Sequence, residues 1–226
     1  MPISLSILLT ATKGIFLFLC SFFKRGDINK VCIISGTPGT GKTFLTKIIS
    51  QKINTFCVFL NELIINEKHT LNYDNARETW VVNEKTLIPR LKEIIKREKR
   101  SKNYELIIIE GHLSDLVPNK LIDYGIVLRC HPDVLKRRLE KRNYKEGKIK
   151  ENVQAEILGD CVSFLLEKKR IKSILEIDTT NENFEEIAKN VVSIIRNDKS
   201  FKKYALGKID WLEELFSNNR LGEFFE

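Results

Sequence analysis

Residues 35–43 read Ser-Gly-Thr-Pro-Gly-Thr-Gly-Lys-Thr. Gly36, Gly41, Lys42 and Thr43 occupy the fixed positions of the G-x-x-x-x-G-K-[ST] phosphate-binding loop. The glycines let backbone N–H groups surround a phosphate, and Lys42 places a positive charge on the terminal phosphates. The Thr43 hydroxyl can fill one coordination position on Mg²⁺. The loop therefore predicts a site for a nucleoside triphosphate with Mg²⁺.

The residues on either side of the loop fit the same interpretation. Residues 31–34 form a short apolar run, which is typical of a buried parallel strand. After the loop, apolar residues recur at helical spacing: Phe44, Leu45, Ile48, Ile49 and Ile53. The first N–H groups of such a helix would point at the bound anion. Strand, loop and helix in this order are the context that the motif requires.

Length and composition set bounds on the rest of the chain. A chain of 226 residues suits one α/β domain with appendages and can bury a sizeable core. With 42% hydrophobic and 30% charged residues, the composition is that of a globular protein. The formal charge of +8 fits a polyanionic ligand, either a nucleotide or RNA. Solubility alone explains the same charge equally well.

The cysteines indicate a reduced, cytoplasmic protein. Their number is odd, no C-x-x-C pattern occurs, and three of them lie in or beside apolar strand-like runs. We therefore expect neither a disulfide nor a zinc framework. The five are Cys20, Cys32, Cys57, Cys130 and Cys161.

Residues 1–27 form a hydrophobic N-terminal extension. Residues 3–23 are nearly all apolar except for Lys13, and Lys24 and Arg25 follow. Three interpretations stay open: a misassigned start near residues 28–31, a membrane anchor with the following domain in the cytoplasm, and an additional packed helix. Lys13 makes a membrane span costly. No basic region precedes the apolar run, which disfavours a signal peptide.

Beyond the loop, strands and helices alternate. Apolar runs predict five strands, at residues 31–34, 56–60, 106–110, 126–128 and 174–177. Helical spacing predicts helices at residues 44–53, 82–102, 134–139, 153–165 and 184–195. Such alternation predicts a five-stranded parallel sheet with helices on both faces, the fold of a P-loop NTPase. We expect this domain to span residues 28–200, with a helical tail at residues 201–226.

Two further segments carry candidate chemistry. Glu110 ends the third predicted strand at the edge where ligands bind, and a carboxylate there can hold Mg²⁺ through its water shell. His112 follows two residues later. Alternatively, Glu110 only ends a strand and His112 is a surface residue. The basic run at residues 136–150 is either a solvated helix face or a lid that brings charge to the transferred group. Arg138 and Arg142 are four apart, which predicts one shared helix face.

The class of P-loop protein follows from size and missing motifs. A GTPase would carry Asn-Lys-x-Asp, and residues 119–123 miss this spacing by one residue. A ring-forming ATPase would need a longer chain. A small domain with a lid and a segment between its second and third strands favours a nucleoside-phosphate kinase.

The loop Gly36–Thr43 resembles that of the adenylate kinase isoenzyme six family, which has archaeal and eukaryotic members. The resemblance covers roughly residues 30–215. Further matching positions are Glu110-Gly111-His112, Asp115 and Pro118; Leu128-Arg129, Pro132, Leu135, Arg138-Leu139, Arg142 and Tyr144; Lys148, Glu151-Asn152 and Ala155-Glu156-Ile157-Leu158; and Asp210-Trp211-Leu212.

The resemblance implies an adenylate-kinase-like fold with a short lid and the reaction ATP + AMP ⇌ 2 ADP with Mg²⁺. It also implies ATPase activity tied to maturation of the small ribosomal subunit, with a platform ribosomal protein and the small-subunit (16S) rRNA as partners. Two alternatives to an ADP-forming enzyme stay open: an ATP-driven assembly switch with incidental kinase activity, and another small-molecule kinase of this fold.

The resemblance also implies roles for single residues. Catalytic roles fall to Lys42, His112 and Arg142, and the metal ligands would be Thr43 and Glu110. Arg138 would stack on adenine, and Asn181 would lie near the adenine edge. The nucleotide would be held by Gly39, Gly41, Lys42, Thr43, Phe44, Arg138, Arg142 and Asn181.

The resemblance implies less about the site that binds the acceptor, AMP. The lid would span residues 141–151 and the AMP-binding segment residues 62–86, where Arg77 would contact the AMP phosphate. Glu78 and Asn83 stand where aspartates are common in the family.

Overall fold

The strand that precedes the phosphate-binding loop lies at the centre of a parallel sheet. The computed structural model describes residues 29–75, 79–167, 171, 173–181, 183–197 and 202–225. β1 (Lys30–Ser35) pairs with β5 (Leu106–Glu110) on one side and β6 (Tyr124–Arg129) on the other. β2 (Thr55–Phe59) and β7 (Ser173–Asp178) complete the order β2-β5-β1-β6-β7. The prediction of five parallel strands is confirmed.

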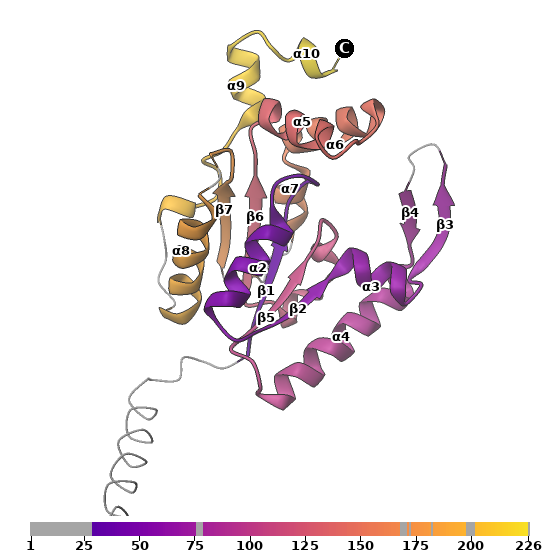
Figure 1. The fold of residues 1–226 in the computed structure, drawn as a ribbon, viewed down its shortest axis with the longest axis vertical. Helices are drawn as coiled ribbons and strands as arrows, with labels where there is room; N and C mark the ends of the chain where they lie inside the picture. The colour runs from indigo at the N-terminus through magenta and orange to yellow at the C-terminus, as the bar shows by residue number, and fades with distance from the viewer. Residues whose placement is uncertain are drawn as a thin grey trace, which may run out of the picture.

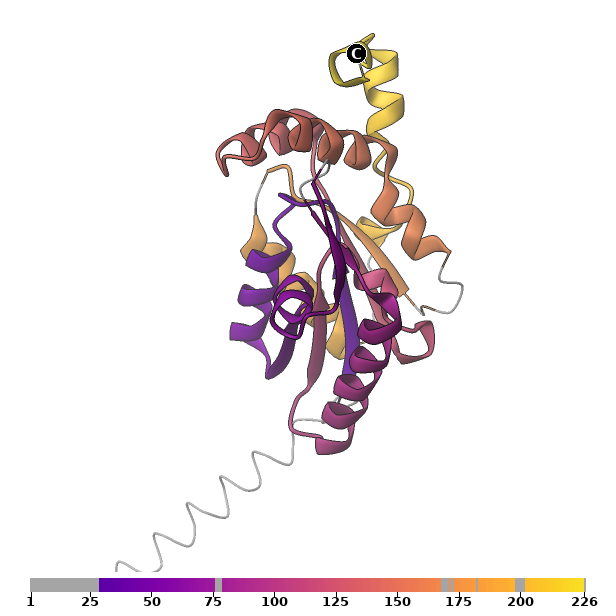
Figure 2. The same cartoon turned by 90° about the vertical axis from the view of Figure 1, so that its right-hand side faces the viewer.

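Helices cover both faces of this sheet, as predicted (Figures 1 and 2). Cys32 and Ile34 face α2 (Lys42–Lys52) and α8 (Phe184–Asn197), whereas Val31 and Ile33 face the opposite side. That side is covered by α3 (Leu60–Asn66), α4 (Glu84–Ser101) and α7 (Asp160–Leu166). A strand buried on both faces is apolar at every position, which explains the unbroken run at residues 31–34.

A third layer lies across the carboxyl ends of the strands (Figure 1). It contains α5 (Pro132–Glu140) and α6 (Glu146–Leu158), with α9 (Trp211–Ser217) and α10 (Gly222–Phe225) packed beside them. A separate apolar cluster holds these helices together, and its members include Leu135, Leu139, Val153, Leu215 and Phe224. The C-terminal helices therefore pack on the elements that flank the predicted lid.

Three expectations about secondary structure were wrong or incomplete. The predicted helix at residues 153–165 is two helices, because Gly159 adopts a left-handed φ of 71° and ends α6 before α7 begins. Leu60, predicted as the last residue of a strand, begins α3 instead. Within the predicted acceptor segment, β3 (Thr70–Asp74) and β4 (Thr79–Val82) form an antiparallel pair that the apolar pattern did not reveal.

The predicted N-terminal extension, residues 1–27, lies outside the described residues. In the part of the chain that the structure describes, no helix combines the length and the apolar character needed to cross a bilayer. Four of the five cysteines are described, and none of these four forms a disulfide.

Candidate active site

The phosphate-binding loop adopts a conformation that requires glycine. Gly39 and Gly41 both have a φ of 98°, a backbone angle that residues other than glycine rarely adopt. A Cβ on Gly41 would also lie 2.3 Å from the ring of Phe184. Gly41 is the N-cap of α2, and no side chain caps that helix. The first N–H groups of α2 and its positive dipole end are thus available to an anion.

Lys42 lies inside the loop rather than on the surface. Its Nζ donates hydrogen bonds to the carbonyl oxygens of Gly36 (2.7 Å) and Thr37 (3.1 Å). The residue is 9% exposed, and burial lowers the pKa of the amine, with nearby Glu110 opposing that change. The ammonium is therefore held at the loop that would receive the phosphates.

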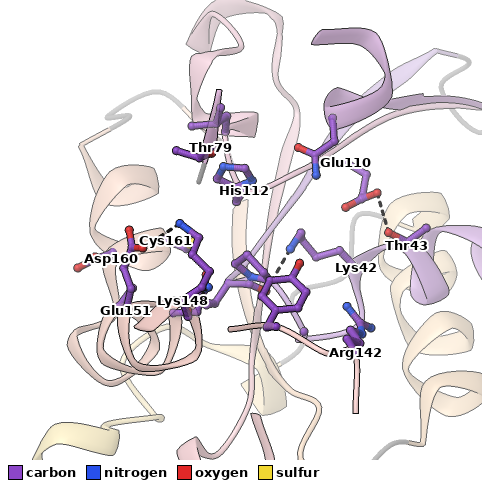
Figure 3. Close-up of a pocket in the computed structure, with 18 of the residues that line it drawn as sticks. Lys42, Thr43, Thr79, Glu110, His112, Arg142, Lys148, Glu151, Asp160 and Cys161 are labelled. Carbon is purple, nitrogen blue, oxygen red and sulfur yellow. Dashed lines mark hydrogen bonds and ion pairs between the residues drawn. The ribbon is translucent and has the colours of Figure 1, made fainter. Parts of the chain in front are cut away.

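Thr43 and Glu110 are brought together by α2 and the end of β5. The Thr43 hydroxyl donates a 3.0 Å hydrogen bond to Glu110 Oε2 (Figure 3). Burial raises the pKa of Glu110, while Lys42 and the Thr43 hydrogen bond oppose that rise. A hydroxyl and a carboxylate side by side are oxygen ligands of the kind that Mg²⁺ takes. No three His, Cys, Asp or Glu side chains gather as a metal site among the described residues, so most ligands of such an ion would be water and phosphate.

His112 also lies in the cleft (Figure 3). It follows Gly111, which has a φ of 157° and packs its backbone against Leu60. The residue is exposed toward the cleft. Desolvation by the surrounding protein lowers the pKa of its imidazole to about 4, and the charges of Lys42 and Lys148 contribute to that shift. The ring is neutral near pH 7, so one nitrogen donates and the other accepts a hydrogen bond.

The predicted lid differs from the expected helix face. α5 ends at Glu140, and Arg142 lies in the following turn, where its N–H bonds to the Leu139 carbonyl at 3.0 Å. Arg138 and Arg142 therefore do not share one helix, which corrects the expectation from their spacing. Arg142 is exposed and lines the cleft. The predicted lid, residues 141–151, consists of this connection and the beginning of α6.

Arg138 is directed toward the backbone beside the loop. Its Nη2 donates to the Thr179 carbonyl at 2.7 Å, and its Nη1 lies 3.4 Å from the Gly39 carbonyl. Asn181 is exposed two residues after Thr179. The structure thus brings Arg138 to the phosphate-binding loop and to the loop that carries Asn181. Its predicted stacking on adenine stays a prediction.

One cleft of about 920 Å³ joins most of the predicted site residues (Figure 3). Phe44 contributes an exposed ring that meets Phe184 edge-on at 5.1 Å. Other lining residues had no individual role predicted from the sequence. Five of them lie in the predicted AMP-binding segment: Ile64, Ile65, Thr79, Trp80 and Val82. Lys148 and Glu151 are positions that carry the family resemblance, whereas Asn61, Asp160, Cys161 and Phe164 were not predicted to lie at the site. Arg77 lies outside the described residues.

The amino-acid sequence is similar to those of known proteins. Residues 32–159 match a family described as "AAA domain". A "Putative adenylate kinase" of Methanocaldococcus jannaschii is 37% identical over 183 residues, covering 81% of this chain and 93% of that protein. Another, from Methanosarcina acetivorans, is 33% identical over 187 residues, covering 80% and 97%. A solved structure, "Shikimate kinase from Acinetobacter baumannii in complex with shikimate", aligns with TM-score 0.47 and 11% identity over 78% of this chain and 97% of that one.

Proposed function

The chain belongs to the family of archaeal proteins named "Putative adenylate kinase", and from this premise we propose that it transfers the γ-phosphoryl group of ATP to AMP. The observation that carries the proposal is that a single cleft joins the phosphate-binding loop to the predicted AMP-binding segment. The phosphate-binding loop, Glu110, His112 and Arg142 line it together with Trp80 and α3, which belong to the opposite wall. Its volume of about 920 Å³ lies at the upper end of the range of about 300–1,000 Å³ that is common for small-molecule pockets.

ATP binds with its phosphates on the loop. No protein side chain caps the start of α2, so its first N–H groups are available to the β- and γ-phosphates. The ammonium of Lys42 adds positive charge beside them. Arg138 and Asn181 do not line the cleft itself, and their proposed place is beside the adenine base. Thr43 and Glu110 would hold Mg²⁺, which neutralises charge on the β- and γ-phosphates when bound.

AMP binds at the opposite wall of the cleft. There Ile64, Ile65 and Trp80 offer apolar surface against which a base can pack, and Trp80 is 48% exposed. Arg77, in the segment between β3 and β4, is the proposed contact for the AMP phosphate.

Phosphoryl transfer needs correctly positioned substrates and positive charge near the transferred group, and it needs no nucleophile from the protein. An oxygen of the AMP phosphate attacks the γ-phosphorus in line, a new P–O bond forms, and the bond to the bridging oxygen of ATP breaks. Closure of residues 141–151 brings Arg142 onto the transferred group and excludes water. Neutral His112 hydrogen-bonds the reacting phosphates without adding charge. If water enters in place of AMP, the same groups support slow ATP hydrolysis.

An acceptor assay tests this proposal. The full chain is incubated with ATP, Mg²⁺ and one of AMP, CMP, UMP or GMP, and nucleotide products are separated by chromatography. We expect ADP to form with AMP as the preferred acceptor. Preference for another acceptor would identify a different small-molecule kinase, and absence of transfer to all four would refute the proposed reaction.

A second candidate function is an ATP-dependent switch in maturation of the small ribosomal subunit. The formal charge of +8 is compatible with a polyanionic partner such as the small-subunit (16S) rRNA. A protein with this role would work beside the ribosome in the cytoplasm. The exposed apolar side chains Leu71, Tyr73 and Val81 on the β3–β4 pair favour a protein partner, here a platform ribosomal protein.

A binding experiment separates the switch from the kinase. The full chain is mixed with purified platform proteins and small-subunit rRNA, with ATP, with ADP and without nucleotide. We expect retention that changes with the nucleotide. Equal retention under all three conditions, or none, would exclude a nucleotide-controlled switch.

A further inference from the structure

A buried carboxylate, Glu156 on α6, joins the phosphate-binding loop to the C-terminal tail. It is 1% exposed and accepts hydrogen bonds from three side chains that lie far apart in the sequence. The donors are the Thr37 hydroxyl at 2.6 Å, Arg129 Nε at 2.8 Å and Trp211 Nε1 at 3.3 Å. The Cys130 N–H adds a fourth bond at 3.1 Å.

Arg129 extends this network to a second part of the tail. Its Nη1 donates to Glu176 at 2.6 Å, and the other carboxylate oxygen of Glu176 accepts the Gly207 N–H at 2.9 Å. Burial lowers the pKa of Arg129, but Glu156 and Glu176 more than offset that effect. Buried charges persist only when each is paired and hydrogen-bonded, so the tail contributes bonds that the cluster needs.

Thr37, whose hydroxyl bonds to Glu156, also takes part in hydrogen bonds within the phosphate-binding loop. The Thr37 carbonyl accepts hydrogen bonds from Lys42 Nζ at 3.1 Å and from the Thr40 hydroxyl at 2.9 Å. Glu156 also lies close enough to Lys42 to act on the charge of its amine. The position of Thr37 thus affects both the backbone N–H groups of the loop and the ammonium that would meet the phosphates.

The tail is anchored independently of these polar bonds. Leu215 and Phe224 are buried in the apolar cluster with α5 and α6. The Trp211 ring meets His131 edge-on, with centroids 5.2 Å apart. Packing therefore holds the indole N–H beside Glu156, and we expect the tail to stay in place when that hydrogen bond is lost.

We propose that the C-terminal tail, residues 202–225, is a working part of the ATP site: Trp211 is a positioning residue that, through Glu156, fixes Thr37 and the phosphate-binding loop. This inference rests on the proposed role of that loop in binding ATP. It does not depend on AMP being the acceptor.

The test uses two variants of the full chain that each remove one hydrogen-bond donor; Thr37→Val keeps the shape of the side chain, whereas Trp211→Phe keeps an aromatic ring but is smaller. Trp211→Phe removes the indole N–H, and Thr37→Val removes the hydroxyl. The Kd for ATP is measured by calorimetry without AMP, and Tm is recorded in parallel. We expect each variant to raise the Kd for ATP about three- to tenfold, because a bond to a buried charge is lost. The KM for AMP should change by less than about twofold, since the opposite wall is untouched.

Coupling between the two variants gives a sharper readout. Because both act through Glu156, the double variant should raise the Kd by about as much as the larger single change rather than by the product of the two. Thr37→Ser keeps a hydroxyl and should restore wild-type binding. Phe216→Ala on α9, at a side chain that is 66% exposed, is the matched control and should leave the Kd unchanged.

Two results would overturn the inference. One is a lower Tm with an unchanged Kd for ATP in both variants, which would make the tail a purely structural element. The other is a wild-type Kd in folded Thr37→Val, which decides the matter even if Trp211→Phe does not fold. Wild-type protein that binds ATP and forms no ADP from AMP would refute the proposed reaction and leave this inference standing.

Discussion

Replacement of Lys42 by methionine is expected to separate catalysis from stability. Methionine keeps most of the volume of the side chain but removes its charge and both hydrogen bonds to the loop. Lys42 is the only residue of the predicted catalytic group that is buried within the loop itself. The variant therefore tests the charge and not the packing.

The change in stability should be small because two effects oppose one another. The Gly36 carbonyl loses its 2.7 Å bond, and leaving an acceptor unsatisfied costs about 1–3 kcal/mol. The Thr37 carbonyl keeps its 2.9 Å bond from Thr40. Burial lowers the pKa of Lys42, so removing this ammonium also removes a desolvation cost. We expect the free energy of unfolding to change by no more than about 1 kcal/mol.

The effect on transfer should be much larger. A donor directed at charge that develops in the transition state contributes about 2.7–4 kcal/mol, so kcat should fall about 10²–10³-fold. ADP formation at saturating ATP and AMP measures kcat, and urea unfolding measures stability. Lys47→Met, at an exposed lysine of the same helix, is the control. A kcat within about tenfold of wild type in folded Lys42→Met would refute the phosphate role of Lys42.

Three further predictions concern other parts of the site. Gly41→Ala should lower the free energy of unfolding by about 2–4 kcal/mol, because its φ is strained and its Cβ meets Phe184; an unchanged urea midpoint would contradict this. Glu110→Gln should raise the Mg²⁺ concentration for half-maximal ADP formation by about tenfold or more, and an unchanged requirement would exclude Glu110 from the metal site. His112 has a folded-state pKa of about 4 against an ordinary value of 6.5, so protonation of the unfolded state removes stability as pH falls through that range. His112→Gln should thus lose less stability than wild type between about pH 7 and about pH 4.5 in urea unfolding, and equal losses would show that His112 titrates normally.

The sheet was predictable because its central strands β1, β5 and β6 are buried on both faces. Val31 to Ile34 and Leu106 to Ile109 are fully buried, so their sequences are apolar without alternation. The break at Gly159 was not visible in the same way. Apolar residues on both sides of it continue a helical period, and only the left-handed backbone of Gly159 separates the two helices.

The acceptor wall was the least predictable part of the site. β3 and β4 present exposed residues such as Leu71 and Trp80, so no buried face imposes a period on their sequence. The contacts of Glu156 were hidden for another reason. Its partners Thr37, Arg129 and Trp211 lie in segments that only the tertiary fold brings together. Motif spacing, by contrast, predicted the cleft positions of Lys42 and Glu110, because P-loop and strand-end residues meet at one sheet edge. Arg142 was placed there by the family resemblance, and its spacing from Arg138 wrongly predicted a shared helix face.

The most direct test of the proposed reaction is its stoichiometry. Full-length protein is incubated with ATP, AMP and Mg²⁺, and ADP, AMP and inorganic phosphate are followed over time. We predict two ADP formed for each AMP consumed, with little phosphate released. Release of ADP and phosphate from ATP at the same rate with and without AMP, while AMP is not consumed, would contradict a kinase and leave an ATPase.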